Sequence, residues 1–440
     1  MNEESKLESP SPMQSRYAHA WRALRHRNFR LYIVGQGISV IGTWMTRIAM
    51  AWLVYRLTHS ALMLGTIGFA NQISMFLLAP VAGVVIDRVN RQKLLMWTQA
   101  LLMAHSLTLA ALTLTHTITV PTIFCLAIFQ GLVNTFDMPT RQSFYSRMVE
   151  DREDLTNAIA LNSAIFNCAR LLGPSLAGML IAATSEGWCF LIDGISFAAV
   201  LTSVAMMRIP AEAEKKERAH PVEELREGWN YMVQAVAIRD LLGLFMVVCL
   251  MGWPFTTLMP VFAAQVLHGG PHTLGFLMGA LGLGALTGSV SLSLRRTVRG
   301  LVGTLPLAAL GMGCGLILFG FSKVLWVSLI LMLFTGFSLL RGTVGTNTLV
   351  QTLLDDKMRG RVMAYYTLVL EGMGPWGALS AGTLAERLGA PHAVMISGTA
   401  CILGSVWFWL RIGKVRAAMR PTFERLGIVP VLVVSDGIES

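Results

Sequence analysis

Long apolar stretches recur along the whole of this 440-residue chain, and they limit its possible folds more than any other feature. About 20 consecutive apolar residues let a helix cross the hydrocarbon core of a bilayer. Of all residues, 54% are hydrophobic and 14% are charged, whereas soluble domains carry about 25% charged residues. We therefore predict an all-α polytopic membrane protein with twelve transmembrane helices arranged as two six-helix bundles. The predicted spans are residues 29–54, 61–86, 94–114, 119–140, 155–183, 187–207, 240–265, 271–293, 300–320, 324–347, 361–385 and 391–410.

The basic residues predict the orientation. When alternate connections are assigned to opposite sides, 29 of the 35 Lys and Arg residues fall on the side that holds both termini, and three fall on the other side. Basic connections stay in the cytoplasm, so we predict cytoplasmic termini in a plasma membrane, which in a bacterium is the inner membrane. A nucleic-acid partner is disfavoured, because the basic residues are scattered over seven segments and do not form one patch.

A charged segment divides the chain into two halves that resemble each other in sequence. Residues 131–151 align with 336–356, and each block is followed by a helix that carries Gly-Pro. Such repeats occur in transporters that bind substrate at the repeat interface, although loop composition can also coincide by chance. The predicted parts are a cytoplasmic segment 1–28, a bundle 29–207, a linker 208–239, a bundle 240–410 and a cytoplasmic tail 411–440.

The connection between the second and third stretches carries the most specific motif. It reads Gly83-Val-Val-Ile-Asp87-Arg88-Val-Asn-Arg91-Gln-Lys93, which resembles the loop signature of the major facilitator superfamily, in the same loop and on the same side. The resemblance implies the fold of that superfamily and a gating role for these five numbered residues. Gly83 would permit close helix contact, and Asp87 would cap the next helix or pair with the basic cluster. The alternative is a generic basic loop.

A second motif lies in the fifth stretch, Arg170-Leu-Leu-Gly173-Pro174-Ser-Leu-Ala177-Gly178. It is similar to the antiporter motif of exporters in that superfamily, with Ala177 in place of the first of two paired glycines. Proline bends a helix and glycines let a neighbouring helix approach. A proline-kinked packing helix without a transport role is the alternative.

Further segments resemble the branch of the superfamily that contains the enterobactin exporter. These segments are residues 26–30, 51–58, 136–142, 157–162 and 190–197. The resemblance implies the export of a siderophore-like or amphiphilic drug-like molecule. One exporter motif is incomplete, because Ala127 stands where an arginine linked to proton coupling is usual, three residues before Gln130.

Polar residues recur at helical spacing on the first, fourth and tenth stretches, and residues so spaced share a helix face. In the resembled superfamily, helices 1, 4, 7 and 10 line the substrate cavity, so we predict a cavity lined by these faces and by the broken seventh stretch at Trp253-Pro254. Contacts between helices are the alternative role. The candidates are Gln36, Ser39, Thr43, Arg47, Gln130, Asn134, Thr256, Thr257, Arg341 and Asn347.

Glu371 lies near the middle of an apolar stretch, where a charged side chain costs about 2.5–3.5 kcal/mol on insertion scales. Desolvation at that depth favours the protonated acid. We predict that Glu371 couples transport to protons and that Arg47 or Arg341 tunes its charge; a simple hydrogen bond to a neighbouring helix is the alternative. Asp137 and Asp193 are the next candidates, and we expect Asp193 to pair with Arg170.

Other classes of protein find no support in the motifs. The chain has no G-x-x-x-x-G-K-[ST] loop, no H-E-x-x-H and no G-x-S-x-G, which disfavours an ATP-driven pump and an intramembrane enzyme. The six cysteines show no C-x-x-C spacing, so we expect no metal and no cofactor. We predict a monomeric, proton-coupled secondary exporter of a small organic molecule. An importer or lipid-type transporter of the same fold, or a membrane scaffold, is the alternative.

Overall fold

The computed structural model describes residues 22–149, 152–207, 221–295 and 297–428. Most of the predicted N-terminal segment, the first part of the linker and the last residues of the tail lie outside the described residues, as does the side chain of Asp87. The described residues form helices and contain no strand.

Six long helices make up the first half of the molecule, preceded by a short 3₁₀ helix, η1. They are η1 (Arg22–Arg25), α2 (Arg27–Thr58), α3 (Ala61–Arg88), α4 (Arg91–Leu114), α5 (Val120–Met148), α6 (Arg152–Ala183) and α7 (Glu186–Ala205). Their ends are set by local signals. Ser60 and Asn90, for example, cap the first turns of α3 and α4 through the backbone N–H groups of Met63 and Lys93.

The second half follows the linker. It consists of α8 (Pro221–Gln234), α9 (Val236–Val247), η2 (Val248–Gly252), η3 (Trp253–Leu258), α10 (Met259–Val261), η4 (Phe262–Val266), α11 (Pro271–Ser293), α12 (Leu301–Phe321), α13 (Leu325–Leu353), α14 (Asp356–Leu388) and α15 (Ala390–Arg425). The segment from α9 to η4 is one membrane-length run that changes to π and 3₁₀ geometry around Pro254 and Pro260. The predicted break at Trp253-Pro254 is therefore present.

Within the described residues, eleven helical segments are long and apolar enough to cross a membrane. This is one fewer than predicted, and the difference is α14. That helix has 33 residues and packs along α3, but it carries Glu371 and a basic first part, which lower its hydropathy. The all-α polytopic fold is confirmed.

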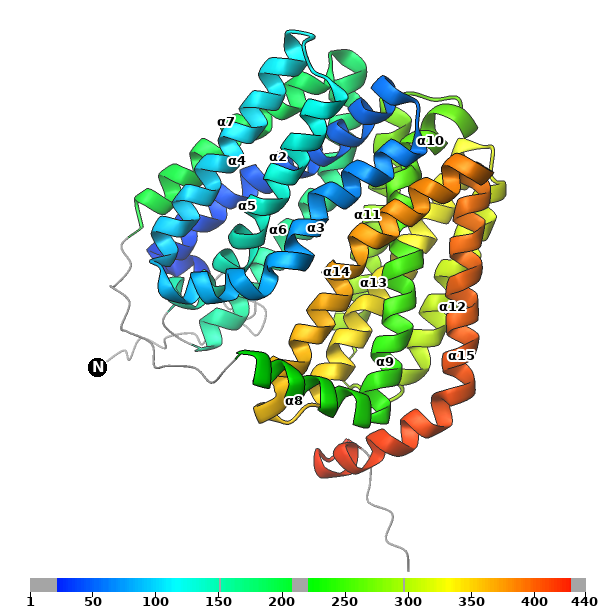
Figure 1. Cartoon of the computed structure of the whole chain (residues 1–440). Coiled ribbons are helices and arrows are strands. Elements are labelled where there is room, and N and C mark those ends of the chain that lie inside the picture. The colour runs from blue at the N-terminus through cyan, green and yellow to red at the C-terminus, as the bar shows by residue number, and fades with distance from the viewer. Residues whose placement is uncertain (1–21, 150–151, 208–220, 296, 429–440) are drawn as a thin grey trace, which may run out of the picture.

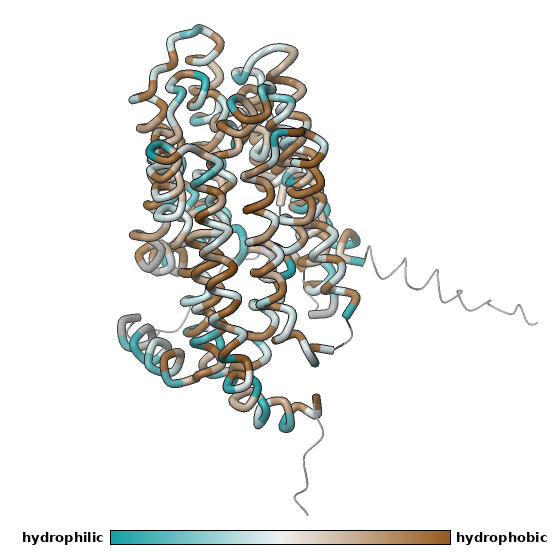
Figure 2. Tube along the Cα trace, turned by 90° about the vertical axis from the view of Figure 1, so that its right-hand side faces the viewer, coloured by the Kyte–Doolittle hydropathy of each residue, from teal (hydrophilic) through white to brown (hydrophobic). Residues whose placement is uncertain are grey.

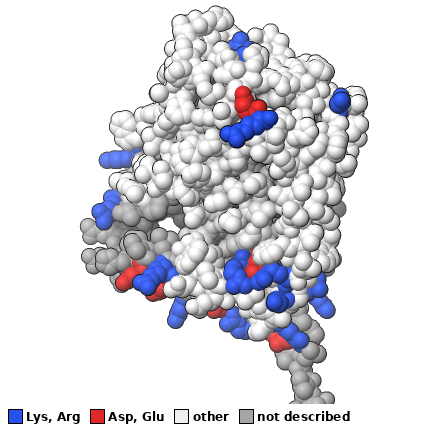
Figure 3. Space-filling view, turned by 45° about the vertical axis from the view of Figure 1, so that its right-hand side comes forward, with Lys and Arg blue, Asp and Glu red and all other residues white. Residues whose placement is uncertain are grey.

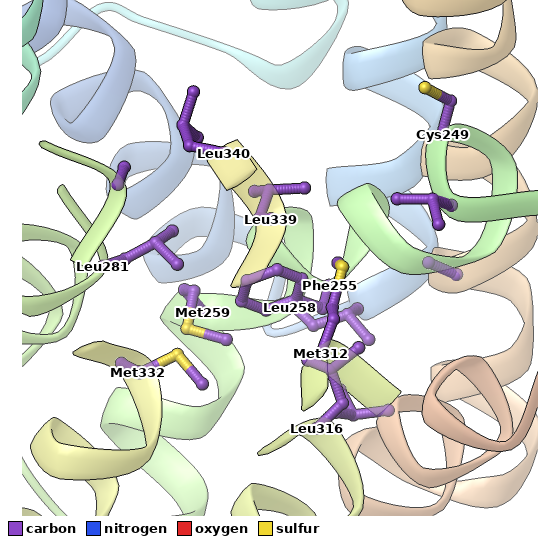
Figure 4. Close-up of a cluster of buried hydrophobic side chains, with 14 of the residues drawn as sticks. Cys249, Phe255, Leu258, Met259, Leu281, Met312, Leu316, Met332, Leu339 and Leu340 are labelled. Atoms are coloured by element: carbon purple, nitrogen blue, oxygen red, sulfur yellow. The ribbon is translucent and has the colours of Figure 1, made fainter. Parts of the chain in front are cut away.

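The outer surface suits a lipid environment. Large apolar side chains such as Leu410, Trp326 and Ile330 are mostly exposed, and charged groups on the visible face gather toward the two ends with a wide uncharged belt between them (Figure 3). Hydrophobic segments run along most of the length of the long helices (Figure 2). Inside the second half, Phe255, Met312 and their neighbours pack into a continuous apolar cluster (Figure 4).

The two halves meet mainly through two helix pairs, α3 with α14 and α6 with α11, with smaller contacts of α2 and α3 to the second half. Both contacts are tightest at one end of the molecule, which we call the closed end; it holds the α2–α3 and α14–α15 turns. A Cβ atom on Gly65 would lie 2.5 Å from the carbonyl oxygen of Ala378. Glu386 accepts hydrogen bonds there from Ser60 Oγ (3.0 Å) and from the backbone N–H of Leu62 (3.1 Å).

At the opposite end, which we call the terminal end because α2 begins and α15 finishes there, the halves diverge (Figure 1). A Cβ atom on Gly83 or Gly360 would meet no atom within 4 Å. The linker helix α8 lies at this end against α14, where Glu227 pairs with Arg361 and the rings of Trp229 and Tyr365 lie 5.7 Å apart. The molecule is therefore closed at one end only.

Candidate functional site between the two halves

Three charged side chains lie near one another between the halves: Arg47 on α2, Arg170 on α6 and Glu371 on α14. The charges of both arginines act on Glu371, and Arg47 also acts on Arg170. Trp44 joins the group, because its ring centroid lies 4.9 Å from the Arg47 guanidinium carbon and 5.4 Å from that of Arg170. Contacts of this kind between arginine and tryptophan are favourable.

The helices place these groups at mid-depth. Glu371 lies near the middle of the 33-residue α14, and Arg170 lies just past the middle of the 32-residue α6. Trp44 and Arg47 are three residues apart on α2 and so share a face. Arg47 is solvent-accessible although it lies deep among the helices, and Glu371 is half-buried. The site is therefore polar, accessible and shared by both halves.

The antiporter-like motif explains how α6 reaches this position. A Cβ atom on Gly173 would lie 2.5 Å from the Cβ atom of Trp44, so only glycine lets α6 approach α2 here. Pro174 lies inside α6 and is buried. One turn further on, a Cβ atom on Gly178 would lie 2.6 Å from the carbonyl oxygen of Pro271 and 2.9 Å from the Cα atom of Gly275 in α11. The motif thus packs α6 against both halves.

Two cavity candidates of the first helix lie elsewhere. Gln36 and Ser39 are each 2% exposed, and α2 packs closely against α7 along this stretch. We expected both side chains to line a cavity. They do not, because the polar face in the first part of α2 is directed toward α7. Thr43, one turn further along α2, is exposed, and its hydroxyl group donates a 3.4 Å hydrogen bond to Asp193 Oδ1 of α7. It therefore lies at the edge of the α2 face that packs against α7.

The candidates on the fourth span are partly engaged in packing. Asn71 of α3 donates a 2.7 Å hydrogen bond to the side-chain oxygen of Gln130. Asn134, one turn further, is half-buried. In the part of the chain that the structure describes, the Asn134 side chain forms no hydrogen bond, whereas Gln130 is bonded to α3. Gln130 therefore serves the contact between helices that we gave as the alternative role.

The candidates in the second half are likewise partly engaged in contacts within the protein. Thr256 donates to the carbonyl oxygen of Trp253 at 3.1 Å, and Thr257 is half-buried. The guanidinium carbon of Arg341 lies 5.6 Å from the ring centroid of Phe337, one turn away on α13. Asn347 accepts a hydrogen bond from Gln351. Arg341 is not among the groups that act on Glu371, so of the two predicted partners only Arg47 is in place.

Asp137 holds helices together. It is 1% exposed and pairs with Arg141, while Thr98 Oγ1 (2.8 Å) and Gln99 Nε2 (2.6 Å) of α4 donate to it. Arg141 lies one turn further along the same helix, α5. Because the carboxylate is satisfied by one cation and two donors, its arrangement is that of a structural anchor between α4 and α5.

Asp193 is equally buried, but its partners are hydroxyl groups. Ser106 Oγ of α4 donates to Oδ2 at 2.8 Å, and Thr43 of α2 approaches Oδ1. The expected ion pair with Arg170 is not formed between these two described side chains, because Arg170 turns to Trp44 instead. The sequence places the two residues on consecutive spans but does not determine their neighbours.

The loop motif lies at the terminal end. Asn90 caps α4, because its side chain accepts a hydrogen bond from the backbone N–H of Lys93 at 3.0 Å. Arg91 is 6% exposed, whereas Arg88 and Lys93 are exposed. Gly83 faces open space in this conformation. Its role in close helix contact is therefore left to a conformation in which this end closes.

Two residues of the site were missed by the sequence reasoning, Trp44 and Glu386. Trp44 follows Thr43 directly and lies one turn before Arg47, so the polar face of α2 contained a signal for it. Glu386 lies near the end of an apolar span, where an acidic residue reads as an ordinary helix end, and the sequence held no signal that it contacts α3.

A comparison with family models decides the class of protein. The family described as transmembrane secretion effector, within the major facilitator superfamily, matches residues 18–424. The chain belongs to this family. The prediction of a secondary transporter that exports small molecules is confirmed at this level. Curated relatives are similar to this transporter in sequence along most of its length.

The staphyloferrin A transporter of Staphylococcus aureus is 24% identical over 84% of this chain and 92% of its own. The multidrug efflux pump Tap of Mycolicibacterium fortuitum is 25% identical over 86% and 95%. The enterobactin exporter EntS of Citrobacter koseri is 23% identical over 90% and 94%.

Solved structures agree on the fold. The transporter superposes on the nucleoside transporter NupG with a TM-score of 0.68 at 11% identity, over 88% of this chain and 99% of that one. A bacterial homologue of the lysosomal transporter Spinster, in an inward-facing and unoccupied conformation, gives 0.64 at 13% identity over 95% and 99%. At these identities the likeness concerns the fold alone.

Proposed function

We propose that this transporter exports its cargo by alternating access and that Glu371 couples the movement to protons. One observation carries the proposal: Glu371 belongs to the second half, and the arginines whose charges act on it, Arg47 and Arg170, belong to the first. Ionised Glu371 attracts the first half toward the second, and protonation removes that attraction. A proton at this position therefore changes how the halves hold together.

We further propose that the terminal end faces the cytoplasm. The support is the charge distribution, since basic connections are retained on the cytoplasmic side. The described conformation would then be inward-open, with the closed end toward the exterior. Binding of cargo between the halves would shift the balance toward the outward-open state. The protein would reside in the plasma membrane and act as a monomer.

The cargo that we propose is a siderophore-like or amphiphilic drug-like molecule. The support is that curated relatives of similar length carry names of siderophore transporters and of multidrug and macrolide efflux proteins. Tryptophan beside two arginines suits a molecule with a planar apolar part and polar groups.

The first prediction tests the coupling. Glu371→Gln keeps the shape of the side chain but cannot exchange a proton, so it should abolish transport driven by a pH gradient. Binding and counterflow exchange of cargo should persist, because neither requires a proton cycle. Purified protein in proteoliposomes, with an imposed pH gradient and labelled cargo, provides the measurement.

Glu223→Gln is the matched control, because Glu223 is an exposed glutamate of the linker helix α8. It should transport like the unmodified protein. Full gradient-driven transport by Glu371→Gln would exclude the coupling role and direct attention to Asp193 and Asp137. Loss of counterflow exchange together with gradient-driven transport would show that Glu371 serves binding or folding.

A further inference from the structure

Arg47 and Arg170 lie side by side in the same half of the transporter, beside one indole ring. Their guanidinium carbons are 4.9 Å and 5.4 Å from the Trp44 centroid, and their charges act on each other. Like charges repel each other, and they do so more strongly among packed helices than in bulk water. Two arginines so placed on packed helices therefore require negative charge nearby.

The carboxylates of the protein compensate only part of the positive charge of these two arginines. Among the described residues, neither arginine forms an ion pair, and Glu371 is the one carboxylate whose charge acts on both. The four buried acids that the structure describes in this half have other partners: Asp137 pairs with Arg141, Asp154 with Arg22, Glu186 with Arg56, and Asp193 accepts from Ser106. With Glu371 ionised, the group still carries one excess positive charge.

We infer that Arg47 and Arg170 bind an anionic oxygen group of the cargo, such as a carboxylate, while Trp44 packs against its planar apolar part. The inference rests on the proposed function, because it takes the space between the halves to be the cargo path. Guanidinium groups recognise carboxylates through paired charge-assisted hydrogen bonds. The same two charges repel a cationic cargo.

An anionic cargo changes what drives export. A negative charge that leaves a cell moves down an electrical potential that is negative inside. Glu371 supplies the internal counter-charge when the arginines hold no cargo, so it competes with the cargo for them. Removing its charge should therefore strengthen anion binding, whereas removing either arginine should weaken it.

The experiment compares cargo molecules that share one aromatic scaffold and differ in charge. Proteoliposomes receive a mixture of aromatic carboxylates, the matching amides and the matching quaternary ammonium compounds, and uptake is followed by mass spectrometry. Each mixture is tested with potassium diffusion potentials of both signs and with pH gradients of both signs. Protein-free liposomes give the passive rates. The variants are Arg47→Gln, Arg170→Gln, Arg47→Lys and, as the control, Arg299→Gln, an exposed arginine in the α11–α12 connection.

We expect the unmodified protein to move carboxylates at least about tenfold faster than amides, a ratio that corresponds to about 1.4 kcal/mol. A potential that is positive inside the vesicles should accelerate their uptake. Arg47→Gln and Arg170→Gln should lose the preference, Arg47→Lys should keep it at a lower rate, and Arg299→Gln should behave like the unmodified protein.

Equal or faster transport of amides or ammonium compounds would overturn the inference and leave the proposed export function standing. Unchanged carboxylate rates in both glutamine variants would also overturn it. If no class moves under any gradient, the proposed function itself fails, and the inference fails with it. Protein that elutes as a single species, with Arg47→Lys retaining the preference, separates a binding defect from misfolding.

Discussion

Asp193 is held by hydroxyl groups of two other helices and forms no ion pair with any residue that the structure describes. Ser106 of α4 donates to one carboxylate oxygen at 2.8 Å, and Thr43 of α2 approaches the other at 3.4 Å. The side chain is 1% exposed. Because it connects α7 to α2 and α4 at once, it sets the register in which these three helices pack.

The corresponding prediction concerns stability. Asp193→Ala leaves the hydroxyl of Ser106 buried without its acceptor, and such a loss costs about 1–3 kcal/mol. Thermal unfolding of the purified protein in detergent should therefore shift to lower temperature. Asp193→Asn can still accept from Ser106 through its amide oxygen and should shift less. A fully stable Asp193→Asn protein without gradient-driven transport would instead indicate a role in proton movement.

At the scale of single residues, the sequence was informative about depth and face but not about partners. It placed Glu371 at mid-depth and identified Arg47 as a possible partner, and the structure brings these together with Arg170. Spacing along one helix cannot reveal the neighbour across an interface. Arg170 was therefore assigned to Asp193, although Gly173 brings α6 so close to Trp44 that its arginine lies beside that ring.

At the scale of helices, glycine determines where the two halves touch. Gly178 of α6 meets Gly275 of α11, and Gly65 of α3 meets Gly382 of α14. In each pair a Cβ atom would come within 3.0 Å of the backbone of the opposite helix. Both pairs lie toward the closed end, so any added side chain holds that end apart.

Gly178→Val should therefore reduce the fraction of molecules in the described conformation. Valine at this position would collide with Pro271 and Gly275, and the conformation in which this end is open would avoid the collision. Spin labels on α6 and α11 at the closed end should report longer distances by pulsed electron resonance. Gly413→Val is the control, because a Cβ atom at Gly413 meets nothing within 4 Å; equal distances in both variants would contradict the prediction.

The loop between α3 and α4 gives a prediction at the same scale. Asp87→Asn should remove most transport while the protein still reaches the membrane at normal level, since the carboxylate would hold the terminal end when that end closes. The measurement is efflux from cells at matched protein content. Normal efflux would show that the signature acts through topology alone.

The helix boundaries show which part of a helix can be predicted from hydropathy. The apolar windows ended at 410 and began at 361, whereas α15 continues to Arg425 and α14 begins at Asp356. Hydropathy reports only the part of a helix that lies in lipid, and helices continue into water wherever they find partners. Arg425, at the end of α15, donates to Asp355 at 2.8 Å, just before α14.

At the scale of the whole molecule, the sequence predicts an orientation. A cysteine introduced at either terminus, in a variant whose six native cysteines are replaced by serine, should resist an impermeant thiol reagent added to intact cells. It should react once the cells are permeabilised. The reason is that basic segments on the terminal side are retained in the cytoplasm. Labelling of either terminus from outside would refute the orientation.

The sequence sufficed for the class of fold, because twelve apolar stretches and two motifs permit few alternatives. It could not indicate which end is closed, since the same chain must visit both conformations to work. The closure depends on contacts between distant segments, such as Glu386 with Leu62. Neither residue stands out from its own surroundings in the chain.

The hydrogen bonds from Ser60 and Leu62 to Glu386 are exposed at the surface. Hydrogen bonds to a charged group contribute about 1.5–3 kcal/mol each, and water competes for this carboxylate at the exposed surface, whereas about 1.4 kcal/mol changes a population ratio tenfold. Thermal fluctuation therefore breaks these two hydrogen bonds often, so they do not by themselves keep the closed end shut. In a transporter whose two conformations differ little in free energy, cargo of modest affinity can shift the equilibrium between them. Its turnover then does not depend on breaking a strong bond.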